Sequence, residues 1–262
     1  MTTANFKKEK KMSKQKEPTA WQTTLRVGKQ KVPPRICLYG GHGIGKSTLA
    51  SQFPEPIFIS TEDGLDSLDV TSFPKATENS QIIDAIGTLI KEDHKFKTCV
   101  IDSVDWLIEP LISTLVESSH EAKDLAYGKF AVLCAEEFRE ILQGLDVLRQ
   151  KRGLNIVLVA HSQVSKFEDP RTEPYDRYSP KLPNRCNALL MEWVDVLAFC
   201  AMDVMIRKSD TGFNTSKTRG VSSGERLLHY VETPAFASKN RYGCPEQSPM
   251  SYEELSSVIP VV

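Results

Sequence analysis

The stretch from Leu38 to Ala50 combines glycines, a lysine and hydroxyl side chains in an order that suits phosphate binding. It fits the pattern G-x-x-x-x-G-K-[ST]. Glycine lets the backbone approach a ligand closely, and a glycine loop that leads into a helix directs several N–H groups at one point. We therefore expect ATP and Mg²⁺ to bind here, with contacts from Gly40, Gly41, His42, Gly43, Ile44, Gly45, Lys46, Ser47 and Thr48.

Within this loop, Lys46 would reach the β- and γ-phosphates and the Ser47 hydroxyl would hold Mg²⁺. Asp102 is the second expected Mg²⁺ ligand, because it ends the apolar stretch "TCVID". Glu62 follows another apolar stretch, "PIFIS". Glu62 or its neighbour Asp63 could orient a water molecule for attack on the γ-phosphate. Acids at strand ends also occur as surface loop residues, and that alternative stays open here.

These residues can share one site only if a sheet brings the ends of their strands together. The sequence predicts alternating strands and helices, which would form such a sheet. We expect strands at "RICLY", "EPIFIS", "KTCVIDSV" and "LNIVLVAHSQ". Helices are expected at "NSQIIDAIGTLIKED", at the long amphipathic segment that Gly153 stops, and at "SYEELSSVI", where Ser251 and Glu254 would form a capping box. This alternation predicts an α/β fold with a mostly parallel central sheet flanked by helices. "RLLHYVETP", a returning strand after a hairpin, predicts a C-terminal antiparallel extension.

Composition is that of a soluble globular protein, with 262 residues, 40% hydrophobic and 26% charged. No apolar run is long enough to span a bilayer, and the start of the chain lacks the apolar core of a signal peptide. The six cysteines show no C-x-x-C pairing, so we expect buried, reduced thiols. These features predict a cytoplasmic protein that makes no membrane contact.

The first 33 residues are expected to form a disordered basic tail, and residues 34–262 a single domain. Six lysines and two glutamates lie between Lys7 and Glu17. This tail could be a solubilising extension or an arm that touches nucleic acid phosphates. Because the formal net charge is only −1, any nucleic-acid binding must use local patches.

Several segments resemble the RecA family of P-loop ATPases. "IFISTEDGLDSL", "CVIDSVDWL" and "VLVAHSQV" are similar to that family's second core strand, Walker B strand and sensor strand. "YGKFAVLCAEEFREILQGLDVLR" and "FEDPRTEPYDRYSPKL" resemble the phage-encoded Sak single-strand-annealing group more narrowly. "SKNRYG" is similar to the K-N-R-F-G motif of RadA-type recombination ATPases. The resemblance covers roughly residues 35–259 and implies a RecA-like P-loop NTPase fold.

The resemblance also implies a role for each matching residue. Glu62 would be the catalytic base, and Gln163 would sense the γ-phosphate, with His161 competing for that role because the register at "HSQ" is ambiguous. Lys239 and Arg241 would act on the phosphates of a neighbouring subunit. The implied partners are further copies of this chain, in a ring or filament with ATP at subunit interfaces, and phage or host replication and recombination proteins.

Two segments are candidates for single-stranded DNA contact. Residues 164–184 are polar and contain several prolines, so we expect them to form a long loop. They mix cations and aromatic side chains, which suits phosphate contact and base stacking, although interleaved acids could instead pair with those cations. A second basic patch surrounds the expected hairpin and consists of Arg207, Lys208, Lys217, Arg219 and Arg226.

The sequence therefore predicts an ATPase that acts on single-stranded DNA in phage or prophage recombination or annealing, in a bacterial host cell. Two alternatives remain open. One is a helicase loader or assembly factor, whose main partner would be protein. The other is a P-loop kinase, which would need an acceptor pocket and an arginine lid.

Overall fold

We describe the protein from a computed structural model, whose described residues are 28, 32–210 and 216–262, with the side chains of 205–222 outside the description. Residues Val32 to Val262 form one compact unit. Apart from residues 28, 32 and 33, the expected basic tail lies outside the described residues. No helix of the described part is both long and apolar enough to cross a bilayer.

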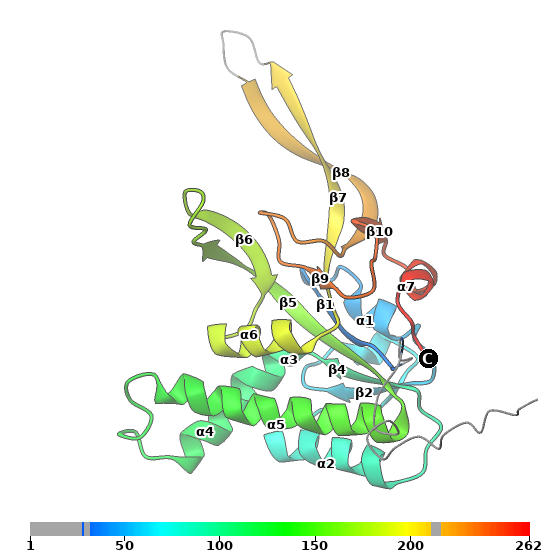
Figure 1. The fold of residues 1–262 in the computed structure, drawn as a ribbon, viewed down its shortest axis with the longest axis vertical. Helices are drawn as coiled ribbons and strands as arrows, with labels where there is room; N and C mark the ends of the chain where they lie inside the picture. The colour runs from blue at the N-terminus through cyan, green and yellow to red at the C-terminus, as the bar shows by residue number, and fades with distance from the viewer. Residues whose placement is uncertain (1–27, 29–31, 211–215) are drawn as a thin grey trace, which may run out of the picture. The chain divides into compact units, whose positions relative to one another are not determined.

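A single sheet organises this unit (Figure 1). Its parallel part has the order β7-β1-β5-β4-β2-β3. The bounds of these strands are β7 Val196–Asp210, β1 Arg35–Gly40, β5 Asn155–Phe167, β4 Thr98–Asp102, β2 Pro56–Ser60 and β3 Thr71–Ser72. Antiparallel pairing adds β8 (Ser216–His229) and β9 (Lys239–Asn240) to β7, β10 (Gln247–Pro249) to β8, and β6 (Tyr175–Pro180) to β5. The expected mostly parallel sheet with a C-terminal antiparallel extension is confirmed.

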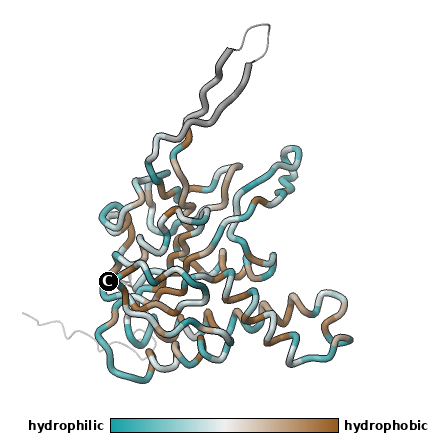
Figure 2. The backbone as a smooth tube through the Cα atoms, turned by 180° about the vertical axis from the view of Figure 1, so that it is seen from behind, coloured by the Kyte–Doolittle hydropathy of each residue, from teal (hydrophilic) through white to brown (hydrophobic). Residues whose placement is uncertain are grey.

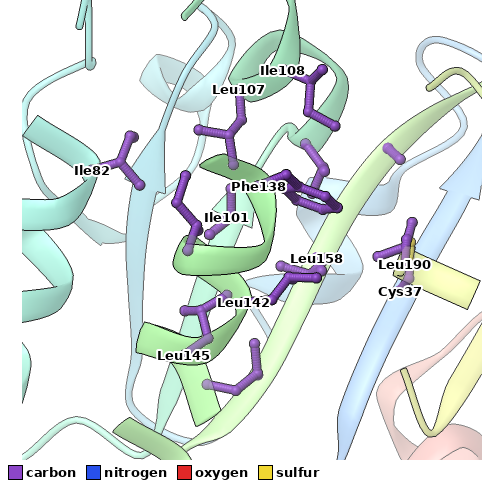
Figure 3. Close-up of a cluster of buried hydrophobic side chains, with 14 of the residues drawn as sticks. Cys37, Ile82, Ile101, Leu107, Ile108, Phe138, Leu142, Leu145, Leu158 and Leu190 are labelled. Carbon is purple, nitrogen blue, oxygen red and sulfur yellow. The ribbon is translucent and has the colours of Figure 1, made fainter. Parts of the chain in front are cut away.

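Helices cover both faces of the parallel sheet, and alternate strand residues point to opposite faces. On one face, Cys37, Ile101 and Leu158 pack with side chains of α2 (Asn79–Lys91), α5 (Lys129–Arg152) and α6 (Asn184–Trp193) (Figure 3). The short helices α3 (Val104–Trp106) and α4 (Ser113–Ser119) flank a π-helical segment, Leu107–Ile112, on this side. A buried strand with both faces covered must be apolar throughout, which explains the continuous apolar runs of the sequence.

The other face packs against helices from opposite ends of the unit. Leu38, Val100 and Val159 meet side chains of α1 (Lys46–Ala50) and α7 (Tyr252–Val258). Hydrophobic residues concentrate along the central strands, whereas the tip of the β5–β6 ribbon is hydrophilic (Figure 2). All six cysteines are buried and free, as the sequence predicts.

The polar segment after Gln163 is not the long loop that its prolines suggest. β5 continues to Phe167 and pairs with β6 in register from Ser162↔Pro180 to Phe167↔Tyr175. The prediction was wrong because cross-strand pairing satisfies the backbone of this segment even though its side chains are polar.

At the C-terminus, Ser251 accepts the N–H of Glu254, which is one of the two bonds of the expected capping box.

The hairpin of β7 and β8 holds the second expected basic patch. Within it, the structure describes the side chain of Arg226, whereas Arg207, Lys208, Lys217 and Arg219 belong to the side chains outside the description. That patch therefore stays a prediction from the sequence.

Candidate nucleotide-binding site

The carboxyl ends of neighbouring parallel strands bring the predicted residues together. Gly40 at the end of β1 pairs with His161 of β5, and Asp102 at the end of β4 pairs with Ser60 of β2. The strand order places β5 between β1 and β4, so His161 lies between the phosphate-loop strand and the Asp102 strand. Ligands of open α/β sheets bind at this edge.

A cavity of about 360 Å³ opens at this edge. Its lining includes Gly43, Gly45, Lys46, Ser47, Thr48, Glu62, Asp63, Asp102, His42 and His161. The loop, the acids and the histidine that the sequence singles out are thus joined in one cavity. The Ser47 hydroxyl and the Asp102 carboxylate supply oxygen donors of the kind that Mg²⁺ prefers, so the residues present fit this ion.

The phosphate loop needs glycine at two positions for different reasons. Gly45 has φ of 102°, a left-handed conformation that side chains rarely adopt. A Cβ added at Gly40 would lie 2.3 Å from the carbonyl oxygen of Cys200, so only glycine allows β1 and β7 to approach this closely. The Lys46 ammonium is buried and donates to the carbonyls of Gly40 (3.1 Å) and Gly41 (2.8 Å). The loop thus holds its cation in place in the wall of the cavity.

Hydrogen bonds between the ends of β2 and β4 position Glu62. Thr61 donates its N–H to the carbonyl of Asp102 (2.8 Å) and its hydroxyl to the carbonyl of Ser103 (2.7 Å). The N–H of Ser103 donates back to the Thr61 hydroxyl (2.8 Å). Glu62 is half-buried and lines the cavity, whereas the exposed Asp63 is engaged by Lys75 at 2.8 Å. This geometry favours Glu62 over Asp63 as the water-orienting acid.

Burial dominates the electrostatics of the cavity. Burial raises the pKa of Glu62, and the Ser103 hydroxyl and His161 oppose that rise. Burial also raises the pKa of Asp102, against the effects of Ser47 and Lys46, and it lowers the pKa of Lys46. A carboxylate with a raised pKa is a stronger base, which suits Glu62 to accept a proton from water.

His161 lies at the centre of a buried polar cluster that sequence reasoning found only in part. The backbone N–H of His161 donates to Asp105 Oδ1 (3.0 Å), and the ring Nδ1 of His161 lies 2.8 Å from Asp105 Oδ2. The pKa of Asp105 is lowered overall, because the hydrogen bonds from His161 outweigh the opposing effect of burial. The His42 ring of the phosphate loop stacks on the His161 ring at 3.9 Å. The only sequence signal for Asp105 is a second acid three residues after Asp102.

Gln163, the residue matched to the sensor, does not line this cavity. Its amide lies 3.3 Å from the carbonyl oxygen of Pro180 and 3.4 Å from that of Leu182, beside a different cavity. The physical reason is that β5 leaves the parallel sheet after His161 and pairs with β6 instead. Of the two candidates that the sequence left open, the structure places His161 at the phosphate loop.

Lys239 and Arg241 lie at the opposite edge of the sheet. Lys239 donates to the carbonyls of Met191 and Glu192, and Arg241 forms an ion pair with Asp195 at 3.0 Å. Asp195 also binds Arg35, which begins β1, whereas the phosphate loop follows the end of that strand. Within one chain, neither cation reaches the phosphate loop.

The cations of the β5–β6 ribbon are partly neutralised by acids. Arg171 pairs with Asp169 at 3.0 Å, and the buried Arg177 pairs with Glu232 at 2.6 Å while its guanidinium lies over the Phe167 ring. The Arg171–Asp169 pair is a contact of the kind that the interleaved acids of the sequence allow, whereas Glu232, the partner of Arg177, lies outside residues 164–184.

Comparisons with known proteins give a family match and a structural likeness. No curated protein matches the chain. The crystal structure of the RadB recombinase is similar at 15% identity, over 83% of this chain and 87% of that chain, with a TM-score of 0.46. A family model described as an AAA domain matches residues 32–242, which is most of the chain. This protein therefore belongs to the AAA domain family.

Proposed function

We propose that this protein binds and hydrolyses ATP and acts on single-stranded DNA in recombination or annealing. The observation that carries the proposal is the convergence of Lys46, Ser47, Glu62, Asp102 and His161 on one cavity at the carboxyl edge of the sheet. The family match supports the ATPase part of the proposal. The resemblance of the sequence to RecA-like and phage-encoded annealing ATPases supports the part that concerns single-stranded DNA.

Each residue has a distinct task in the proposed reaction. Lys46 and the loop N–H groups bind the phosphates, and Glu62 accepts a proton from the attacking water. Mg²⁺, held by Ser47 and Asp102, would neutralise charge on the phosphate oxygens. His161 takes the sensing role, because it contacts the phosphate loop through His42 and the interior through Asp105.

Lys239 and Arg241 keep their proposed role at the phosphates of a neighbouring subunit. The Arg241 side chain is 50% exposed, so it is accessible at the surface although it also pairs with Asp195. A cation that enters from a neighbour can raise the rate of phosphoryl transfer by several powers of ten. Such a role requires a ring or filament.

Phosphate release with and without single-stranded DNA tests this function. We expect turnover to rise when DNA is added, and the mass of the particle to rise in the presence of a non-hydrolysable ATP analogue. Absence of phosphate release under both conditions would contradict the proposal. Turnover that ignores DNA but rises with a replicative helicase would favour the helicase-loader alternative instead.

Arg226 lies beside the phosphate loop, whereas sequence reasoning assigned it only to a surface patch. Its Nη1 lies 2.9 Å from the position of a Cβ added at Gly45, and among the described residues it forms no ion pair with an acid. We propose that its guanidinium contacts bound nucleotide. Because a hydrogen bond to a charged group contributes about 1.5–3 kcal/mol, Arg226→Ala is expected to weaken ATP binding about 10- to 150-fold.

Titration of a fluorescent ATP analogue measures this effect. Arg139→Ala removes an exposed arginine of α5 and serves as the matched control, with unchanged affinity expected. If Arg226→Ala and the control bind the ATP analogue with equal affinity, the proposed contact between Arg226 and the nucleotide is contradicted.

A further inference from the structure

A second cavity, of about 610 Å³, lies beside the nucleotide site and has no role in the reaction described above. Its lining consists of Asp105, Trp106, Glu109, Gln163, Lys181, Leu182, Pro183 and Asn184. This volume is within the range of small-ligand sites. Trp106 is 45% exposed, so part of this large aromatic residue is accessible from the cavity.

The polar groups around the indole match the parts of one nucleotide. An exposed indole face stacks on any base, and the side-chain oxygen of Gln163 and the amide of Asn184 can hydrogen-bond to a base edge. The exposed Lys181 and the N-terminus of α6, which begins at Asn184, supply positive charge for a phosphate. Glu109 is the one acid of the lining besides Asp105, and a carboxylate accepts from the exocyclic amino group of cytosine.

Short hydrogen bonds connect this cavity to the phosphate loop. Asp105 lines the second cavity and binds His161, which lines the first. On the other side, the N–H of Lys181 donates to the His161 carbonyl at 2.8 Å. A displacement of His161 by a bound phosphate would therefore move Asp105 and Lys181, two residues of the second cavity. A ligand in the second cavity would act on His161 through the same two contacts.

We propose that the second cavity binds one unstacked base of single-stranded DNA, with Trp106 as the stacking surface, and that His161 and Asp105 couple its occupancy to ATP turnover. This rests on the proposed function and places the DNA site where the β5–β6 ribbon joins the sheet, at Gln163 and residues 181–184, and not at the arginines farther along the ribbon. Those arginines are less suited, because Arg171 and Arg177 are already paired with acids.

Oligonucleotide binding by the full chain tests the site. Trp106→Ala is expected to weaken binding of a labelled single-stranded oligonucleotide about 5- to 150-fold, the contribution of one stacked base. Trp106→Phe, which keeps a ring, should retain most of the affinity but lose the quenching of indole fluorescence that DNA causes in the wild type. Tyr127→Ala, which removes a fully exposed aromatic side chain outside the cavity, should bind as the wild type does.

Turnover gives a second readout. In Trp106→Ala, we expect ATP binding and turnover without DNA to be unchanged and stimulation by DNA to be lost. If the wild type binds DNA and Trp106→Ala binds it equally well, the cavity is not the DNA site and is left to a protein partner, while the proposed function stands. If the wild type itself neither binds DNA nor responds to it, the DNA part of the proposed function fails, and this assignment fails with it.

Discussion

Replacement of Glu62 by glutamine is expected to lower ATP turnover about 10²- to 10⁴-fold and to leave ATP binding intact. Glutamine keeps the shape of the side chain and the hydrogen bonds of the neighbouring Thr61 and Ser103, but it cannot accept a proton from water. Single-turnover phosphate release measures the chemical step, and calorimetric titration with ATP measures binding.

Two further variants make this result specific. Asp63→Asn changes the neighbouring acid, which Lys75 already engages, and is expected to keep most of the turnover. Lys46→Ala is expected to abolish binding as well as turnover, because the buried ammonium is the main cation of the phosphate loop. Normal turnover in Glu62→Gln would show that another group activates the water.

Replacement of Asp195 by asparagine is expected to lower the free energy of unfolding by about 3–5 kcal/mol, the typical effect of breaking a buried ion pair. The Asp195 side chain is 6% exposed and lies 2.9 Å from Arg35, 3.0 Å from Arg241 and 3.4 Å from Arg149. The neutral amide would leave these guanidinium groups without their shared anion. Urea denaturation followed by circular dichroism measures the change. Asp63→Asn, at an exposed pair, is the control and should change stability little.

The effect of Asp195 should depend on pH in a defined direction. Burial raises its pKa, but hydrogen bonds and charge from Arg35 outweigh burial, so the folded-state pKa is lowered. A carboxyl group whose pKa is lowered by folding stabilises the fold at pH values above its pKa in the unfolded state, about 3.9. This stabilisation is lost as the pH falls through its pKa in the folded state. The stability difference between wild type and Asp195→Asn should therefore be constant near neutral pH and shrink below about pH 4. A difference that stays constant into acid would contradict this account.

Local patterns in the sequence determined the phosphate loop and the parallel core. The glycines before Lys46 and Ser47 form a motif within a few consecutive residues, and continuous apolar runs mark strands that are covered on both faces. The helix that ends at Gly153 could also be predicted from the sequence, because helical periodicity and a terminal glycine that adopts the left-handed conformation are local features.

The tertiary structure alone decided which residues share a site. The choice between His161 and Gln163 depends on where β5 leaves the parallel sheet, and that point is set by pairing with β6 rather than by any property of "HSQ". Arg226 and Asp105 lie far from the phosphate loop in the sequence and become its neighbours only through the order of strands. Register and strand order arise from contacts between distant segments, so a local pattern of residue types cannot encode them by itself.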